Sequence, residues 1–329
     1  MEKKFKCFLV KEVEGKFVRE IVEREIKDLP ENEILIEVKY SSLNYKDGLS
    51  ASGNRGVTRK FPHVPGIDAA GIIVDGGNSE FKTGEEVIVT GFDLGMNTDG
   101  GFSKYIRVPK EWVLKLPKGL TLKEAMIYGT AGFTAALSVY KLVVKGEVAC
   151  GDGEILVTGA TGGVGSIAVG ILHKLGYTVV AGTGKKSETE LLNKFGASRI
   201  INRNELDDRT RPVLKGIWAG AIDTVGGNIL STVIKSTKYD GVVTACGNVA
   251  GAEFESSVYP FILRGVTLYG VDSVECKMEL RKKVWNLMGN EWKIENLSDF
   301  VEEISLEEVN SKIEMILKGE NKGRTIIKL

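Results

Sequence analysis

Three glycines at three-residue spacing are the residues of this chain with the clearest chemical meaning. Gly159, Gly162 and Gly165 form the pattern G-x-x-G-x-x-G. They follow a short apolar run, 154–158, and open a stretch, 164–175, whose apolar residues fall on one face of a helix. Without side chains, a pyrophosphate can reach the backbone N–H groups at the helix N-terminus, where the helix dipole favours negative charge. The pattern therefore predicts dinucleotide binding; the alternative is a turn that needs glycine only for helix–sheet packing.

The end of the second predicted strand indicates which dinucleotide fits. A site specific for NAD usually carries Asp or Glu there to hold the ribose 2′-hydroxyl. In this chain the strand 177–181 is followed by Gly-Thr-Gly-Lys-Lys at 182–186, and Arg203 follows the third strand. Thr183 can donate a hydroxyl hydrogen bond to a 2′-phosphate, and Lys185 and Arg203 can supply positive charge. We therefore expect NADP(H); the alternative is that these cations are solvated surface charges.

Alternating strand and helix patterns surround the glycine loop. Strands are predicted at 154–158, 177–181, 199–201, 219–225, 241–246 and 266–271. Six strands with crossover segments are enough for a complete doubly wound sheet. A capping box from Ser187 to Glu190 predicts the start of the helix after the second strand.

The first third of the chain has strand patterns without long helical patterns between them. The β-branched runs 34–40 and 85–90 each follow turn residues. We therefore expect an antiparallel, barrel-like domain. A Pro-Lys-Gly turn at 117–119 and a capping box from Thr121 to Glu124 mark the change to the second domain.

Composition limits the classes of function. Lys+Arg and Asp+Glu each number 44, which gives zero formal net charge and argues against the basic face of a nucleic-acid or membrane-surface protein. No apolar run approaches the roughly 20 residues that span a bilayer, and the charged start lacks the apolar core of a signal peptide. Four scattered cysteines and two histidines offer no zinc-site spacing. We expect a soluble, cytoplasmic protein with no nucleic-acid, membrane or metal partner.

Five further motifs are similar to those of one known family. They are SLNYKDGL at 42–49, PGIDAAG at 65–71, IYGTAGFTA at 127–135, WAGAIDTVG at 218–226 and PFILRGV at 260–266. With the glycine loop they resemble the medium-chain dehydrogenase/reductase superfamily, and within it the zinc-independent quinone oxidoreductases of the YhdH/YhfP type, also called the acryloyl-CoA reductase family. The resemblance spans nearly the whole chain. It implies an α/β protein with a GroES-like β-barrel domain at 1–123, a doubly wound Rossmann NADP-binding domain at 124–271, and a return segment at 272–329 that completes the first domain.

The resemblance also implies chemistry without a metal. Zinc alcohol dehydrogenases carry His-Glu where this chain has Ile67-Asp68, and their first cysteine ligand falls at about Asn44. Ile67 cannot ligate zinc and Asn44 is a poor ligand. We expect His173, inside the helix after the glycine loop, to be structural, and we assign no catalytic role to His63.

The family reaction is the reduction of an activated alkene, here acryloyl-CoA to propionyl-CoA, with hydride from NADPH reaching the β-carbon. Hydrogen-bond donors can stabilise the resulting enolate without zinc. The candidate catalytic residues are Asn44 and Tyr45. In the family this tyrosine lies beside the nicotinamide; it can also donate the proton to carbon or simply pack at the domain interface.

The remaining cofactor contacts are those the resemblance implies by motif. With Tyr45 they are Thr161, Gly162, Gly163, Val164, Thr183, Gly184, Lys185, Arg203, Asn248, Ile262, Ser273 and Gly319. Two alternatives to the enoyl-thioester reductase stay open. One is an NADPH:quinone oxidoreductase with the same cofactor site, and the other is a non-catalytic NADPH-binding redox sensor, which would need neither Asn44 nor Tyr45. The resemblance further implies a homodimer, formed through the last Rossmann strand.

Overall fold

The chain forms two compact units. The computed structural model describes residues 4–185, 189–295, 297–321 and 323–329. Unit 1 comprises Met1–Thr130, Val274–Gly289 and Asn296–Leu329, and unit 2 comprises Ala131–Ser273 and Asn290–Glu295. The chain first passes from unit 1 to unit 2 inside helix α2 (Leu122–Val139).

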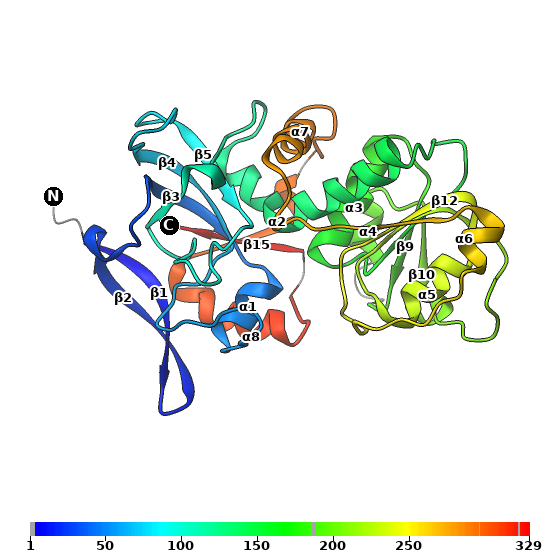
Figure 1. Ribbon diagram of the computed structural model, residues 1–329, viewed down its shortest axis with the longest axis horizontal. Helices are drawn as coiled ribbons and strands as arrows, with labels where there is room; N and C mark the ends of the chain where they lie inside the picture. Colours follow the sequence, from blue (N-terminus) through cyan, green and yellow to red (C-terminus); the bar gives the residue numbers. More distant parts are fainter. Residues whose placement is uncertain (1–3, 186–188, 296, 322) are drawn as a thin grey trace. The chain divides into compact units, whose positions relative to one another are not determined.

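Unit 2 is built on a six-stranded parallel sheet (Figure 1). Its strands are β8 (Ile155–Thr158), β9 (Val179–Thr183), β10 (Arg199–Asn202), β11 (Trp218–Asp223), β12 (Thr237–Ala245) and β13 (Thr267–Gly270). The spatial order is β10-β9-β8-β11-β12-β13. The chain thus reverses its direction of progress between β8 and β11, which is the switch point of a doubly wound sheet. The predicted Rossmann fold is confirmed, although the second strand begins at Val179, two residues later than predicted.

The helices of unit 2 include the one predicted after the glycine loop. They are α3 (Gly163–Lys174), α4 (Thr189–Lys194), α5 (Gly227–Lys235) and α6 (Tyr259–Arg264), with a π-helical segment, η3 (Tyr140–Lys145), and a 3-10 turn, η5 (Arg203–Leu206). Helix α3 buries Ile167, Ile171 and Leu172 as its spacing predicted, and it packs on β8 and β9. Gly176 follows it with φ +85°, as expected for a glycine that ends a helix. The capping box predicted to start at Ser187 lies outside the described residues.

Unit 1 contains a seven-stranded, mostly antiparallel sheet. Along it run β14 (Val301–Ile304), β15 (Arg324–Lys328), β3 (Ile34–Ser42), β4 (Asp68–Asp75), β5 (Glu86–Thr90) and β7 (Leu114–Lys115), while β6 (Tyr105–Val108) pairs with β3. Only β14 and β15 are parallel to each other. This confirms the predicted antiparallel domain, and the last strand brings the C-terminal segment into it. Apolar side chains of β3, β4, β5 and β6 form a core on this sheet.

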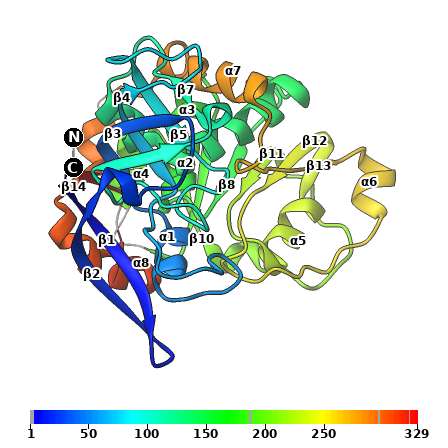
Figure 2. The same ribbon diagram turned by 60° about the vertical axis from the view of Figure 1, so that its left-hand side comes forward.

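The other elements of unit 1 surround the sheet. They are α1 (Tyr45–Ala51), α7 (Met278–Gly289), α8 (Val309–Leu317), and the 3-10 turns η1 (Ile26–Asp28), η2 (Lys110–Trp112), η6 (Leu297–Phe300) and η7 (Leu306–Glu308). A hairpin of β1 (Lys4–Val13) and β2 (Lys16–Glu25) was not predicted, since charged residues alternate with its apolar ones. In Figures 1 and 2 this hairpin, drawn in dark blue, extends away from the seven-stranded sheet.

Helix α2 begins at the predicted capping box and is a core helix. Thr121 Oγ1 accepts from the N–H of Glu124, and the Glu124 carboxylate accepts from the N–H of Thr121. By length and composition Leu122–Lys145 could cross a membrane, but 78% of its apolar window is buried in the fold. A kink at Gly129, with φ +50° and ψ −156°, interrupts the helix.

Replacing Gly129 by alanine should destabilise the protein. Its backbone conformation is nearly confined to glycine, and an added Cβ would lie 2.5 Å from both Asp68 Oδ2 and Ser42 Oγ. Strain and overpacking together predict that Gly129→Ala lowers the free energy of unfolding by at least about 2 kcal/mol. Urea denaturation measures this. The control is Gly151→Ala, where a Cβ meets nothing within 4 Å; equal stability losses in the two variants would contradict the prediction.

Candidate active site

A buried carboxylate, Asp68, is the centre of a hydrogen-bond cluster in unit 1. It begins β4 and accepts from Ser42 Oγ at 2.5 Å and from Asn44 Nδ2 at 2.8 Å. Thr130 donates to it twice, from N at 2.9 Å and from Oγ1 at 2.6 Å. The donors come from the end of β3, the N-cap of α1 and the kinked part of α2. Four donors on two oxygens stabilise a charge that burial alone would penalise.

Arg324, the first residue of β15, brings a buried positive charge to the same cluster. Its Nε donates to Ile127 O at 2.9 Å, and its Nη1 donates at 3.3 Å to both Leu43 O and Asn44 Oδ1. Its Nη2 has no partner among the described residues. Burial lowers the pKa of this guanidinium, and the nearby charges of Asp68 and Asp47 oppose that effect. The C-terminal strand therefore supplies the counter-charge of the cluster.

The side chain of Asn44 lies between these two charges. Its Nδ2 donates to Asp68 and, at 3.3 Å, to Ser42 O, while its Oδ1 accepts from Arg324. A carboxylate only accepts hydrogen bonds and a guanidinium only donates them. The amide nitrogen of Asn44 must therefore face Asp68, and its oxygen must face Arg324. Both amide N–H groups are thus used inside the cluster. Asn44 also caps α1, whose first residue is the exposed Tyr45.

A second buried carboxyl, Asp47, connects α1 to the 65–71 motif. Its Oδ2 accepts from the N–H of Asn44 at 2.7 Å, and its Oδ1 accepts from the N–H groups of Ile67 at 2.9 Å and Gly66 at 3.2 Å. Burial, with the nearby charge of Asp68, raises the pKa of Asp47 to about 7 against the opposing effect of these hydrogen bonds. The start of α1 is therefore held in place by a group that titrates near neutral pH.

The side chains of this cluster do not form a set of ligands for a zinc ion. Ile67 is apolar, and both oxygens of Asp68 already accept hydrogen bonds. His63 is buried, with Nε2 2.9 Å from Gly95 O, and burial lowers its pKa. Across the described part of the chain, no three His, Cys, Asp or Glu side chains are grouped so that they could hold a metal.

In unit 2 the glycine loop packs so closely that two of its glycines leave no room for a side chain. Gly159 has φ +59°, and a side chain there would overlap Thr224. A Cβ at Gly165 would overlap the backbone of Gly159, so this glycine lets helix and strand approach closely. Gly162 is the exposed N-cap of α3. The first N–H groups of a helix have no partner within it, so the N-terminus of α3 offers donors to an anion.

The residues predicted to read the 2′-phosphate lie together at the carboxyl edge of the sheet. Thr161 Oγ1 and Thr183 Oγ1 are 3.2 Å apart, and Thr183 Oγ1 accepts from the N–H of Lys185 at 3.1 Å. Arg203 lies directly against Gly184, since a Cβ at this glycine would be 2.8 Å from Arg203 Cδ and Nε. Strand pairing explains the approach, because β9 and β10 run in parallel and end side by side.

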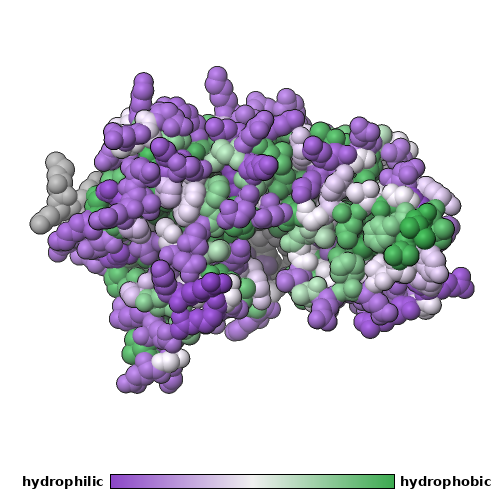
Figure 3. Space-filling view, in the orientation of Figure 1, coloured by the Kyte–Doolittle hydropathy of each residue, from purple (hydrophilic) through white to green (hydrophobic). Residues whose placement is uncertain are grey.

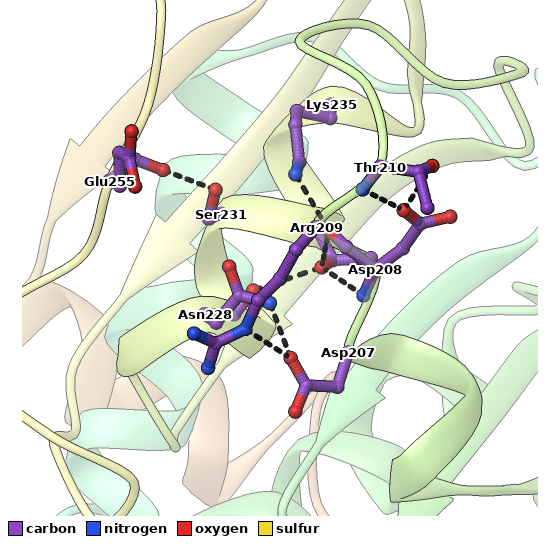
Figure 4. A network of polar contacts seen from close by, with 9 residues as sticks. Asp207, Asp208, Arg209, Thr210, Asn228, Ser231, Lys235 and Glu255 are labelled. Atoms are coloured by element: carbon purple, nitrogen blue, oxygen red, sulfur yellow. Dashed lines mark hydrogen bonds and ion pairs between the residues drawn. The ribbon is translucent and has the colours of Figure 1, made fainter.

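The backbone that follows Arg203 is fixed to helix α5. Lys235 Nζ donates to Asp208 O at 2.7 Å, and the N–H of Asp208 donates to Thr232 Oγ1 at 3.0 Å. Asn228 donates to the Asp207 carboxylate. Figure 4 shows this network, in which side chains of α5 point toward the segment after η5. The network holds the exit of η5, and so the turn that carries Arg203.

Four other predicted cofactor contacts lie at separate places. Asn248 is exposed after β12, and Ile262 is exposed on α6. Ser273 is buried and its hydroxyl accepts from Thr134 Oγ1 at 2.8 Å. Gly319 belongs to unit 1, where it follows α8 with φ +70°. The two predicted catalytic residues, Asn44 and Tyr45, are adjacent at the start of α1.

The sequence patterns did not single out three members of the Asp68 cluster. Asp47 has a detectable signal, because Asn44 and Asp47 have the spacing of a capping box. Asp68 begins a strand whose other residues are mostly apolar, which marks a buried charge, whereas only two of the four residues after Arg324 in its strand are apolar. No local pattern, however, shows that these two distant charges meet.

Two protein-family models match the chain. The alcohol dehydrogenase GroES-like domain matches residues 30–118, and the zinc-binding dehydrogenase family matches residues 163–290. The name of the second family refers to zinc, whereas the side chains around Asp68 do not fit that metal.

Close relatives cover nearly the whole chain. The protein named "Putative quinone oxidoreductase YhfP" of Bacillus subtilis is 47% identical over 305 residues, 92% of each chain. A crystal structure of yhfP from that species with NAD bound has a TM-score of 0.97 at 43% identity, covering 99% of this chain and all of the other. "Probable acrylyl-CoA reductase AcuI" of Escherichia coli is 43% identical over 98% of this chain and 99% of its own. The yhdH oxidoreductase of Salmonella enterica, solved with NADP, has a TM-score of 0.96 at 40% identity, covering 98% and 99% of the two chains.

The buried carboxyl of Asp47 predicts a specific pH dependence of stability. Its pKa rises from 3.8 to about 7 on folding, so the native state holds a proton that the unfolded chain has lost. The stability contributed by this proton is complete below about pH 4 and is lost as the pH rises through about 7, at up to about 1.4 kcal/mol per pH unit. Relative to Asp47→Asn, the unmodified protein should therefore lose stability as the pH rises from about 4 to about 7.

Urea denaturation at several pH values measures this difference. Glu80→Gln, which removes an exposed carboxylate of the same unit, is the control. A difference between the unmodified protein and Asp47→Asn that stays constant with pH would contradict the prediction.

Proposed function

The chain belongs to the YhdH/YhfP/AcuI branch of the medium-chain dehydrogenase/reductase family, and from this premise we propose that it is an NADPH-dependent reductase of activated alkenes. Acryloyl-CoA, reduced to propionyl-CoA, is the proposed substrate. The AcuI relative supports this choice, because it is similar over almost its entire length. The observation that carries the cofactor assignment is the contact of Arg203 with Gly184 beside Thr183, at a strand end without a carboxylate.

The cofactor contacts divide by the part of NADPH that they would hold. Thr161, Gly162, Gly163 and Val164 would bind the pyrophosphate at the N-terminus of α3. Thr183, Gly184, Lys185 and Arg203 would bind the 2′-phosphate. Tyr45, Asn248, Ile262, Ser273 and Gly319 are the remaining proposed contacts. Because the yhfP relative was crystallised with NAD, the preference of this chain must come from its own residues.

Bound NADPH would supply a hydride to the β-carbon of the acryloyl group. The electron pair of the C=C bond then moves toward the thioester oxygen, and the α-carbon takes up a proton. We propose the Tyr45 ring as a contact to the nicotinamide and its hydroxyl as the donor of that proton. We propose Asn44 as a positioning residue, because Asp68 and Ser42 already take both of its amide N–H groups. Its charged neighbours would fix the start of α1 and, with it, Tyr45.

Substrate kinetics test this proposal against its alternatives. NADPH oxidation should be measured with acryloyl-CoA, crotonyl-CoA and a benzoquinone. We expect the highest kcat/KM with acryloyl-CoA. A higher value with the quinone would support the quinone oxidoreductase instead. Tight NADPH binding without turnover of any of these substrates would support the redox sensor.

Removing the Tyr45 hydroxyl tests its proposed role in proton transfer. Tyr45→Phe keeps the ring and removes only the oxygen. If the hydroxyl is the general acid, kcat should fall by about 10²–10⁴-fold, with little change in KM for NADPH. Tyr239→Phe, on an exposed tyrosine of unit 2, is the control. An unchanged kcat would remove Tyr45 from the catalytic residues and leave it as a cofactor contact.

The 2′-phosphate contacts predict a loss of cofactor preference in the double variant Lys185→Ala with Arg203→Ala. A charge-assisted hydrogen bond contributes on the order of 1.5–3 kcal/mol, roughly a tenfold to hundredfold preference for NADPH per contact. KM for NADPH should rise by at least this factor while KM for NADH stays nearly constant. Salt should also weaken the preference of the unmodified protein.

The control for this pair is Arg199→Ala. It removes an exposed cation from the amino end of β10, the strand that Arg203 follows. Equal weakening of NADPH and NADH in the double variant would contradict the assignment. Efficient use of NADH by the unmodified protein would do so as well.

We further propose that two copies pair along β13. This strand ends the sheet of unit 2, and Figure 3 shows a hydrophobic patch over α6. Exposed apolar side chains there include Val258, Ile262 and Leu263. Such a patch usually marks an interface. Light scattering should give twice the mass of one chain, and a monomer at micromolar concentration would contradict the pairing.

A cytoplasmic location is also proposed. Cys7, Cys150 and Cys246 are free thiols. Free thiols are typical of a reducing compartment.

A further inference from the structure

A cavity of about 830 Å³ opens on unit 1 between the β1–β2 hairpin and the segment after α1. Its lining includes Lys11, Glu12 and Glu20 of the hairpin and, from the segment after α1, Arg55, Arg59, Lys60 and Phe61. The proposed hydride-transfer residues do not line it. A cavity of this size can hold a nucleotide-sized ligand.

The charges of this cavity are unequally compensated. Lys11 pairs with Glu20 at 2.6 Å, and Arg55 pairs with Glu12 at 2.6 Å. The side chains of Arg59 and Lys60 are exposed, and the described residues place no carboxylate within 4.0 Å of either. The cavity therefore presents two adjacent uncompensated cations, in a chain whose overall charge is balanced.

The wall that carries these cations is ordered by aromatic and polar contacts. The Arg55 guanidinium lies 5.2 Å from the centre of the Phe61 ring and 5.5 Å from that of Phe17, and the two rings are 4.9 Å apart. Arg55 Nη1 also donates to Arg59 O at 3.0 Å, and the N–H of Arg59 donates to Asn97 Oδ1 at 2.9 Å. A guanidinium held on aromatic rings leaves a flat surface on which an adenine can stack.

Helix α1 connects this cavity to the proposed reaction site. Tyr45 begins the helix, which is about 10 Å long at 1.5 Å per residue, and Arg55 follows its end by four residues. Even a fully extended link adds only about 14 Å, so Tyr45 and Arg55 are at most about 25 Å apart. Arg19 of β2 fixes the hairpin to the end of the helix, donating to Ala51 O at 2.9 Å and to Ser52 Oγ at 3.1 Å. A ligand that uses both places must be long, with anionic groups at the end away from the reaction.

We propose that this cavity binds the 3′-phosphorylated ADP end of an acyl-CoA substrate, with Arg59 and Lys60 paired to its phosphates. Coenzyme A has this form: its reactive thioester and its phosphates are separated by the extended pantetheine arm. The inference rests on the proposed function, which places the thioester near Tyr45. It makes the β1–β2 hairpin part of the substrate site.

A truncated substrate distinguishes the effect of a variant on binding at this cavity from its effect on the reaction. Acryloyl-CoA and acryloyl-pantetheine share the reacting group, but only the first carries the nucleotide. The double variant Arg59→Glu with Lys60→Glu should lower kcat/KM for acryloyl-CoA at least about tenfold, since it replaces two cations that would attract the phosphates with two carboxylates that would repel them. Its kcat/KM for acryloyl-pantetheine should stay unchanged. Lys16→Glu with Lys118→Glu makes the same charge change at exposed positions of unit 1 outside the cavity, and is the control.

A binding measurement tests the cavity without any turnover. Adenosine 3′,5′-bisphosphate should bind the unmodified protein in calorimetry with NADP⁺ saturating the cofactor site, and binding should weaken at least about tenfold in the Arg59/Lys60 double variant. Equal losses of kcat/KM with both thioesters, or unchanged bisphosphate binding in that variant, would overturn the proposal. If the unmodified protein reduces neither thioester, the proposed function fails, and the calorimetry still decides whether the cavity binds this nucleotide.

Discussion

A buried carboxylate must be surrounded by donors, and the arrangement of unit 1 around Asp68 follows from that requirement. Leaving such a charge unpaired would cost several kcal/mol. Ser42, Asn44 and Thr130 satisfy it, and Arg324 supplies positive charge nearby. These residues come from β3, the cap of α1, the kink of α2 and the last strand. One electrostatic constraint thus explains why Gly129 bends α2 and why the C-terminal segment returns to the first unit.

The same constraint shapes the chemistry proposed for the protein. Asp68 is committed to hydrogen bonds, and Ile67 beside it has no ligand atom, so the cluster organises Asn44 and Tyr45 rather than a metal. The negative charges of the cofactor would instead be bound by N–H donors and cations on the surface. We propose the N-terminus of α3 and Arg203 for this purpose in unit 2. The preference for NADPH would then depend on residues of unit 2, and catalysis on residues of unit 1. The variants of Arg203 and Tyr45 test these two roles separately.

The sequence predicted the features that depend on local pattern. The glycine loop, the helix after it and the six strands of unit 2 each have a signal within a few residues, and the structure confirms them. The β1–β2 hairpin was missed because its alternating charges resemble a solvated segment. The Asp68–Arg324 arrangement was missed for a different reason. The two residues are far apart in the chain, and they meet because β3 pairs with β15 on one side and with β4 on the other.

The Asp68 cluster should position Asn44 and Tyr45 without a metal ion, and the decisive test is to measure metal content together with activity. Zinc in the purified protein should be quantified, and NADPH-dependent reduction of acryloyl-CoA should be measured before and after incubation with EDTA. We expect far less than one zinc per chain and the same rate in both assays. One zinc per chain, with activity lost on chelation and restored by added zinc, would contradict it.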